Sequence, residues 1–216
     1  MRIERLIFIP IMMLLLLFAG GCGDEIPYNE WEYQMDLVTF HAFSEPLFVL
    51  DNGVELIPEN QISALPLLPD NGRMLLLYEY ADIEEGNEDR RKIKINSYAR
   101  TYCDTISSVS QQELDVMADD PIFLTSIWQE GRFINIRLSI DVNKDSHTVD
   151  MFCIPEISND TLKLELRHDK KGDVPGCLYS EYFSYDIEKY KTNYRAFSVK
   201  MNTSNYGIKT YVFSLE

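Results

Sequence analysis

The sequence predicts an all-β protein in which a small closed barrel precedes a β-sandwich, and three observations support this prediction. Short runs of alternating apolar and polar residues recur along the chain, separated by turn sequences rich in Asn, Asp and Gly. Aromatic residues suited to strands are abundant, with 13 Tyr and 11 Phe among 216 residues. Only the segment 110–117 reads as a short helix.

The clearest element is a hairpin over 120–141, whose two strands meet through 129–132. Aliphatic and polar residues alternate in its second half, and this period of two places one face in a core and the other in water. The aliphatic residues are Ile134, Ile136, Leu138 and Ile140. Asn135 and Arg137 are therefore expected on the outward face, where they could form a polar docking surface or simply a solvated one.

The N-terminal residues 1–21 are predicted to be a signal peptide. Arg2 and Arg5 precede an apolar run over 6–18, which is shorter than the ~20 residues that span a bilayer. The sequence Ala19-Gly20-Gly21-Cys22 is similar to a bacterial lipobox, which implies acyl chains on Cys22 as a stable membrane anchor. The alternative is a plain secretory signal followed by an incidental cysteine.

Residues 22–35 are acidic, lack a sustained period and are predicted to form a tether. The acids after Cys22 are similar to surface-export signals of Bacteroidota lipoproteins, although a solvated linker explains them equally well. The formal net charge of the chain is −15. Such a charge repels phosphate backbones and anionic head groups, so we expect no nucleic-acid partner and membrane contact through the lipid alone.

Residues 36–115 are predicted to form the barrel, and turns at 51–53 and 70–72 separate several of its strands. The strand runs are 37–42, 47–50, 54–57, 73–80 and one from 92 toward 103. The run 73–80 is almost continuously apolar, which indicates a strand buried on both sides or at the centre of a barrel. This number of strands over about seventy residues fits an OB-like barrel.

Residues 116–216 are predicted to form the sandwich, with the domain boundary at the helical segment 110–117. Further strand runs join the hairpin over 147–153, 162–168, 179–186, 195–201 and 207–215. Short alternating strands with frequent turns are typical of a β-sandwich.

The cysteines and sequence motifs give little support for catalysis. Besides Cys22, the chain has Cys103, Cys153 and Cys177, an odd number from which no pairing can be read, and we expect no obligatory disulfide. No spacing resembles a metal site, and the sequence contains no nucleophile elbow, zinc-protease motif, P-loop or dinucleotide loop. We therefore expect no cofactor and no metal.

The most reactive-looking cluster is Arg167-His168-Asp169, because a histidine flanked by charges can act as a base or a ligand. A structural hydrogen bond at the end of a strand is the simpler role for His168. His147 and His168 could bind a metal with an acid, but their spacing does not favour it. Tyrosines that could stack on sugars are Tyr179, Tyr182, Tyr185, Tyr190, Tyr194 and Tyr206, although packing explains each of them more simply.

Several motifs, taken in order, resemble the NigD-like lipoproteins of Bacteroidota. In the first half these are 48–53 with Pro58, and 70–73 before the apolar strand; in the second half they are 120–122, 127–128, 131–136, 164–169 and 183–186. Phe133 departs from the Leu expected before Ile-Asn-Ile. The resemblance implies an envelope lipoprotein with an OB-type N-terminal domain and a C-terminal sandwich, and it carries no catalytic residues.

These observations predict a non-catalytic lipoprotein of the outer membrane, on its periplasmic or surface-exposed side. The first hypothesis is that it binds an envelope protein through the sandwich or an exposed barrel edge. The alternative is a glycan- or small-ligand-binding lipoprotein that uses the mouth of the barrel, and an enzyme is a third option. Possible binding residues are Asn135, Arg137, Arg167 and His168, and the oligomeric state stays open.

Overall fold

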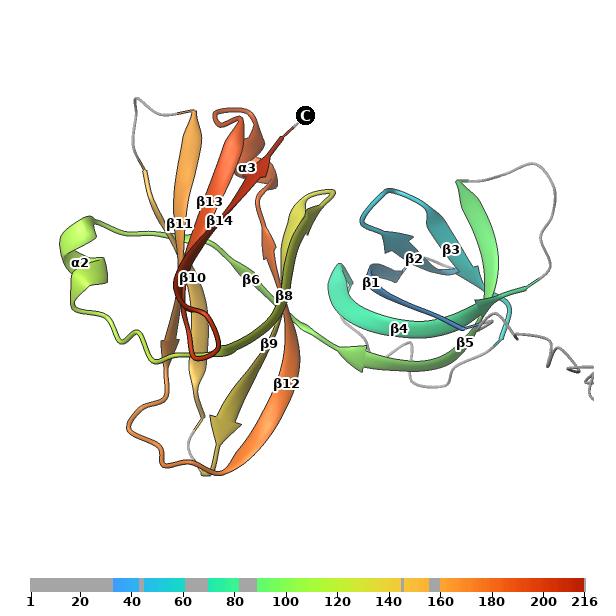
Figure 1. The fold of residues 1–216 in the computed structure, drawn as a ribbon. Coiled ribbons are helices and arrows are strands. Elements are labelled where there is room, and N and C mark those ends of the chain that lie inside the picture. Colours follow the sequence, from blue (N-terminus) through green and yellow to red (C-terminus); the bar gives the residue numbers. More distant parts are fainter. Residues whose placement is uncertain are drawn as a thin grey trace, which may run out of the picture. The chain divides into compact units, whose positions relative to one another are not determined.

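The described part of the chain consists almost entirely of β-strands. The computed structural model describes residues 33–42, 45–60, 70–81, 89–144, 146–155 and 160–215. These residues belong to one compact unit that begins at Tyr33. They form a closed barrel and two further sheets (Figure 1), which confirms the predicted all-β class.

The barrel closes through strands in the order β1-β2-β3-β5-β4, because β1 pairs with both β2 and β4. Its strands are β1 (Tyr33–Ala42), β2 (Pro46–Leu50), β3 (Glu55–Pro58), β4 (Gly72–Tyr80) and β5 (Arg90–Arg100). The small closed barrel expected from the sequence is confirmed. Closure pairs the strands all round, so the exposed barrel edge that was considered as a docking surface is not present in the described barrel.

Apolar side chains fill the barrel interior. On β4, Met74, Leu76 and Tyr78 are fully buried, whereas Leu75 and Leu77 are only partly buried. The run was expected to be buried on both sides or to lie at the centre of a barrel, but the structure shows a strand of the barrel wall with one face fully buried and the other partly buried. The buried residues of this core are Val38, Phe40, Phe48, Leu56, Met74, Leu76, Tyr78, Ile93 and Ile95.

The sandwich consists of two sheets, with strand orders β14-β13-β11-β10-β7 and β6-β12-β9-β8. The first contains β7 (Ser107–Ser108), β10 (Thr148–Ile154), β11 (Thr161–Asp169), β13 (Ala196–Thr203) and β14 (Gly207–Ser214). The second contains β6 (Tyr102–Thr105), β8 (Phe123–Glu130), β9 (Phe133–Val142) and β12 (Cys177–Asp186). One apolar cluster joins residues of both sheets, including Ile136 of β9, Leu164 of β11, Tyr185 of β12 and Val199 of β13.

The predicted hairpin is formed by β8 and β9, which pair antiparallel on either side of Gly131. Ile134, Ile136 and Leu138 are completely buried, as their alternation predicts. Gly131 has a φ of 51°, a left-handed conformation that glycine adopts without a steric penalty. The tight turn after β8 is therefore consistent with the sequence.

Strand pairing passes from the barrel to the sandwich earlier than the sequence suggests. β6 pairs with β12, and β7 pairs with β10, so both strands belong to the sandwich although they lie within the predicted barrel range 36–115. The transition falls at Thr101, between β5 and β6. These two strands are short and polar, and their partners lie far away in sequence, so periodicity gives no sign of them.

Two short helices accompany the sheets. Helix α2 (Gln111–Asp115) begins at a capping box, in which Ser110 and Glu113 each bond the other's backbone amide. The expected helical segment is confirmed. It lies within the sandwich, because β7 before it and the strands after it belong to the two sandwich sheets. Helix α3 (Glu188–Lys191) follows β12.

The signal peptide at 1–21, Cys22 and most of the predicted tether lie outside the described residues. The last three positions of the expected tether, 33–35, belong to β1. Where the chain is described, none of its helices has the length and apolar character needed to cross a membrane.

Candidate functional site

A buried ion pair in the barrel is the centre of the candidate site. Arg73, at the start of β4, donates to the two carboxylate oxygens of Asp51 at 2.6 and 2.9 Å. The side chains of Arg73 and Asp51 are 0% and 4% exposed. Arg73 also donates to the Thr39 hydroxyl at 3.3 Å. Burying two charges is costly unless their geometry is good, and this two-pronged arrangement meets that condition.

The sandwich supplies the remaining partners of the ion pair. The Asn135 amide nitrogen donates to Asp51 at 2.9 Å, while its oxygen accepts from Arg73 at 3.2 Å. The Ser184 hydroxyl also donates to that oxygen, at 2.7 Å. Asn135 lies on β9 and Ser184 on β12, and both are completely buried. We call Asp51, Arg73, Asn135 and Ser184 the junction cluster, because they join the barrel to the sandwich.

The position of Asn135 corrects one expectation from the sequence. Alternation along β9 places Asn135 on the face opposite the sandwich core, and the structure agrees. That face is not in water here, however, because Asp51 and Arg73 of the barrel cover it. Periodicity identifies the side of a strand on which a residue lies, but not whether another part of the chain covers that side.

Two residues of the hairpin bring the barrel and the sandwich into close contact. The Arg73 guanidinium lies 4.0 Å from the centre of the Phe133 ring, within the range of a cation–π interaction. At Gly131, a β-carbon would lie only 2.1 Å from the Asp51 carbonyl oxygen. Glycine is therefore required at the tip of this hairpin for two reasons, its φ and its contact with the turn after β2.

A pocket of about 200 Å³ lies beside the junction cluster. Barrel strands β1 and β4 and the turn after β2 provide one side, and β8 and β12 provide the other. The residues that line it are Met35, Asp36, Leu37, Leu50, Asp51, Asn52, Leu75, Trp128, Glu130 and Tyr182. We call this space the junction pocket. Pockets between domains, with apolar walls and a few polar groups, are typical ligand sites.

The junction pocket combines carboxylates with aromatic walls. Asp51 is already paired with Arg73, and Asp36 accepts a hydrogen bond from the Tyr78 hydroxyl at 2.9 Å. Burial, and then the negative charges of Asp51 and Asp36, raise the pKa of Glu130. A raised carboxyl pKa means that the surroundings disfavour its negative charge. A positively charged group in the pocket would relieve this repulsion, and Trp128 and Tyr182 could stack against it.

Arg137 lies near the junction pocket without being part of its lining. It is partly buried, and its guanidinium is 5.3 Å from the centre of the Tyr182 ring. The contact supports one aromatic wall of the pocket. Arg137 shares the outward face of β9 with Asn135, as the sequence predicts.

His168 belongs to a buried chain of polar groups at one end of the sandwich. Its Nε2 lies 2.9 Å from Nδ1 of His147, whose Nε2 lies 3.4 Å from Asp173. Backbone amides of Asn143 and Lys144 also donate to Asp173, at 2.8 and 3.1 Å. Burial, and then the neighbouring His147, lower the pKa of His168. This arrangement fastens two loops to β11 by hydrogen bonds.

Arg167 takes part in a different network on the opposite face of β11. It donates to Glu165 at 2.7 Å and pairs with Asp119 at 3.3 Å. Lys200 of β13 completes the network, because its ammonium group lies 3.2 Å from Glu165. The network links neighbouring strands of the same sheet and the segment before β8.

The four residues predicted as a possible binding set do not come together. Asn135 and Arg137 lie on the four-stranded sheet, whereas Arg167 and His168 lie on opposite faces of a strand in the five-stranded sheet. Asn135 is part of the junction cluster, and Arg137 lies beside the junction pocket.

Sequence reasoning did not identify Asp36, Trp128 or Glu130 as site residues. Trp128 and Glu130 share one side of β8 by alternation, which was a usable signal. Asp36, however, comes from the barrel, and nothing in the sequence gives its distance from β8. Asp51, Arg73 and Trp128 do appear among the motifs that carry the family resemblance, but without an assigned role.

The described residues offer no obvious centre for a metal. Among them, no three His, Cys, Asp or Glu side chains are grouped closely enough to hold an ion. Cys103 and Cys177 are exposed free thiols, and Cys153 is a buried one. The junction pocket presents carboxylates and aromatic side chains among its lining residues.

The barrel, the sandwich and the junction between them define a two-part, all-β fold. The NigD-like C-terminal β-sandwich domain matches residues 105–215. The chain therefore belongs to the NigD-like family, as the sequence motifs indicated. No curated protein matches the chain significantly.

Solved structures with the same fold come from Bacteroides species. A Bacteroides vulgatus protein of unknown function has a TM-score of 0.74 at 20% identity, covering 85% of this chain and 91% of its own. A candidate lipoprotein from Bacteroides fragilis has a TM-score of 0.63 at 16% identity, covering 85% and 98%. A NigD-like immunity protein from Bacteroides caccae has a TM-score of 0.59 at 18% identity, covering 85% and 97%. At these identities the likeness establishes the fold alone.

Proposed function

We propose that this chain is a non-catalytic, lipid-anchored protein of the outer membrane that binds an envelope protein, and that the junction pocket takes a basic side chain of that partner. The observation that carries the proposal is the junction pocket itself, where carboxylates and two aromatic rings line a concave space beside a buried ion pair. In protein interfaces, a few tyrosine, tryptophan and arginine side chains in water-excluded pockets usually provide most of the binding energy.

The electrostatics favour a cation over a neutral ligand. Asp36, Asp51 and Glu130 are among the residues that line the pocket. The Asp51 carboxylate is paired with Arg73, and that of Asp36 accepts a hydrogen bond from Tyr78. The raised pKa of Glu130 reflects burial first and then repulsion from Asp51 and Asp36, which Arg73 partly offsets. An arginine or lysine side chain would gain from both the carboxylates and the rings. A partner with basic residues would also be attracted by the net charge of −15.

The relatives support an envelope location and a protein partner. One structural relative is named a candidate lipoprotein, which agrees with the lipobox-like sequence at Cys22. Another is named an immunity protein, and that name is compatible with action on another protein. The periplasmic and the surface-exposed face of the outer membrane are both consistent with such an anchor.

A glycan or another small ligand is the second candidate, and the same pocket favours it. Trp128 and Tyr182 could stack on a sugar, while carboxylates accept hydrogen bonds from its hydroxyl groups. The barrel mouth, which the sequence suggested for this role, is less suitable because apolar side chains fill the interior. Charge separates the two candidates, since a neutral sugar would not relieve the repulsion at Glu130.

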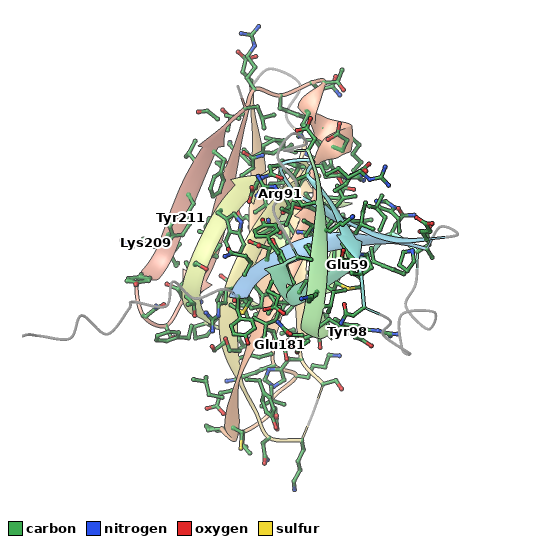
Figure 2. The ribbon with its side chains drawn as sticks, turned by 90° about the vertical axis from the view of Figure 1, so that its right-hand side faces the viewer. Glu59, Arg91, Tyr98, Glu181, Lys209 and Tyr211 are labelled. Carbon is green, nitrogen blue, oxygen red and sulfur yellow. The ribbon has the colours of Figure 1, made fainter. Side chains whose placement is uncertain are left out.

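A titration with small probes tests the nature of the bound group. N-acetyl-arginine amide should shift the indole signal of Trp128 in NMR spectra, whereas the citrulline analogue, which has nearly the same shape without the charge, should not. Glu130→Gln should weaken the effect, and Glu59→Gln, which removes an exposed carboxylate from the barrel (Figure 2), should leave it unchanged. Equal shifts with both probes, or a glycan that binds far more tightly than arginine, would contradict the proposal.

A crosslinking experiment tests the partner. Benzoylphenylalanine placed at Met35, which is 55% exposed at the pocket, should capture an envelope protein in living cells. The same group placed at Glu59 should not capture it, and Glu130→Gln should reduce the yield from Met35. The absence of any protein adduct from Met35, together with robust binding on a glycan array, would favour the second candidate.

A further inference from the structure

The edges of the two sandwich sheets differ in how well they are protected. The edge strands are β14 and β7 in one sheet and β6 and β8 in the other. β7 and β6 contain only two and four residues, and β8 has a register shift between Leu124 and Ser126. Short strands and bulges are common devices that prevent unwanted strand pairing. Three of the four edges therefore carry such protection.

β14 lacks these protective features. It pairs with β13 over eight residues, Gly207–Ser214, in one continuous register, and it contains neither proline nor an acidic residue (Figure 1). Lys209 is its only charged residue, and it is labelled with Tyr211 in Figure 2. Within the part of the chain that the structure describes, β14 has a neighbouring strand on one side only. A long regular edge of this kind is a template for a further strand.

The backbone of β14 presents hydrogen-bonding groups to this free side at alternate positions. The Leu215 amide donates to the Arg195 carbonyl, and this bond continues the β13–β14 ladder. In an antiparallel pair, bonded and non-bonded residues alternate. Lys209, Tyr211 and Phe213 therefore turn their amides toward β13. The amides of Ile208, Thr210 and Val212 then face the open edge.

The side chains of the same alternate residues are also exposed. Ile208 and Val212 are 64% and 65% exposed, although both are aliphatic. Tyr211 and Phe213, on the other face, pack partly against the sandwich core. An added strand would thus find unpaired backbone groups along the edge and apolar side chains on the outer face. Strand addition to a sheet edge combines these two contributions.

We propose that β14 is the docking edge for an extended segment of the protein partner, which adds to the five-stranded sheet as a sixth strand. The partner segment carries apolar residues at alternate positions, beside Ile208 and Val212. A second copy of this chain is a poor occupant, because two chains with a net charge of −15 each repel one another. The inference rests on the proposed function, since it names the kind of segment that the protein partner supplies.

A peptide titration with amide exchange tests the docking edge directly. The probe is a capped peptide of alternating valine and threonine with a lysine at each end. At roughly 90% occupancy it should slow hydrogen exchange about tenfold at the amides of Ile208, Thr210 and Val212. Only the tenth of the protein molecules without bound peptide would then exchange at these amides. The amides of Lys209 and Tyr211, already bonded to β13, are the internal control and should not change. A fully N-methylated peptide cannot donate hydrogen bonds and should not bind.

Matched variants test the same edge from the protein side. Thr210→Pro removes an amide from the open edge but keeps the bonds to β13, and it should abolish peptide binding. Thr210→Ala keeps the amide and should bind like the original chain. Unchanged unfolding midpoints for both variants would show that the sheet is intact. Equal binding by the N-methylated peptide, or full binding by a folded Thr210→Pro protein, would overturn the inference.

Two further outcomes separate this inference from the proposed function. If the Met35 crosslink persists in Thr210→Pro but is lost in Glu130→Gln, a partner binds at the junction pocket without the edge, and only the inference fails. If the Met35 crosslink is absent from the original chain as well, the proposed function fails. A dimer in sedimentation that Thr210→Pro dissolves would identify the occupant as a second copy and overturn the inference.

Discussion

At the scale of single residues, the junction cluster is the feature that most clearly depends on exact side chains. Arg73→Met removes the partner of a carboxylate that is only 4% exposed. Leaving one charge of a buried pair uncompensated costs about 3–5 kcal/mol. We therefore expect Arg73→Met to lower the free energy of unfolding by this amount in urea titrations at neutral pH.

The double variant Arg73→Met with Asp51→Asn is the control for the charge. It removes the unpaired carboxylate, so its free energy of unfolding should be about 1–3 kcal/mol higher than that of Arg73→Met alone. If the double variant loses as much as the two single variants together, the residues do not interact energetically. The ion pair would then be a contact without consequence for stability.

His168 gives a prediction at the same scale for the effect of pH. Its pKa is lowered from the ordinary value of 6.5 by burial and by His147. The unfolded chain therefore binds a proton at this residue more readily than the folded chain does. The contribution of neutral His168 to the free energy of unfolding is complete above pH 6.5. It is lost as the pH falls through the lowered pKa of the folded state.

Urea titrations from pH 8 to pH 5 measure this effect. Wild-type protein should lose more stability over this interval than His168→Gln, whose side chain does not titrate. Groups remote from His168 contribute equally to both proteins, so the difference between the two slopes reports His168 together with His147, to which it is hydrogen-bonded. Identical slopes would show that the histidine has the same pKa in the folded and the unfolded chain.

The sequence predicted the side of the strand on which these residues lie better than their surroundings. Asn135 was placed correctly on the face opposite the core, and Arg167 and His168 were placed correctly on a strand. The burial of Asn135 beneath Asp51 was not predicted, and His168 and His147 were considered together only as possible metal ligands, whereas the structure joins them by a hydrogen bond. Each depends on a residue more than twenty positions away, and alternation contains no information about such contacts.

At the scale of elements, the β8–β9 hairpin is the piece that joins the two parts of the fold. Gly131→Ala should be more damaging than an ordinary glycine substitution at a positive φ. Both Gly131 and Gly53 have positive φ values, 51° and 92°, but a β-carbon at Gly53 would meet nothing within 4 Å. We expect Gly53→Ala to cost about 1–2 kcal/mol from backbone strain alone.

Gly131→Ala adds a collision with the Asp51 carbonyl oxygen to the same strain. Overpacking adds roughly 1–3 kcal/mol, so the two variants should differ by that amount in the free energy of unfolding. Equal effects of the two glycine substitutions would mean that the hairpin tip does not press on the barrel.

Long strands with regular alternation were predictable as elements, and short polar ones were not. Ile134, Ile136 and Leu138 identified β9 from local sequence alone. β6 and β7 have no comparable pattern, because each is only a few residues long and both occupy sheet edges. Their strand character comes from pairing with β12 and β10, which follow much later in the chain.

At the scale of the whole molecule, the acyl anchor proposed at Cys22 would determine where the protein can act. A Cys22→Ala protein should leave the membrane fraction, since one residue would carry all of the acyl chains. Mass spectrometry of the original chain should show cleavage before Cys22 and an added lipid mass. A Cys22→Ala protein that stays in the membrane fraction, with no change in mass, would contradict a lipid anchor at this residue.

The junction cluster also determines whether the barrel and the sandwich unfold together. Asp51 and Arg73 come from the barrel, while Asn135 and Ser184 come from the sandwich, so all four buried groups lose partners when either part opens. We therefore expect one cooperative transition in urea, with Trp128 fluorescence and far-ultraviolet circular dichroism coinciding.

Asn135→Leu keeps the approximate volume but removes every hydrogen bond from the sandwich to Asp51. It should separate the two signals into distinct transitions, whereas Ser198→Ala, on a strand away from the junction, should leave them coincident. Two transitions in the original chain would mean that the junction contributes too little to couple the barrel and the sandwich.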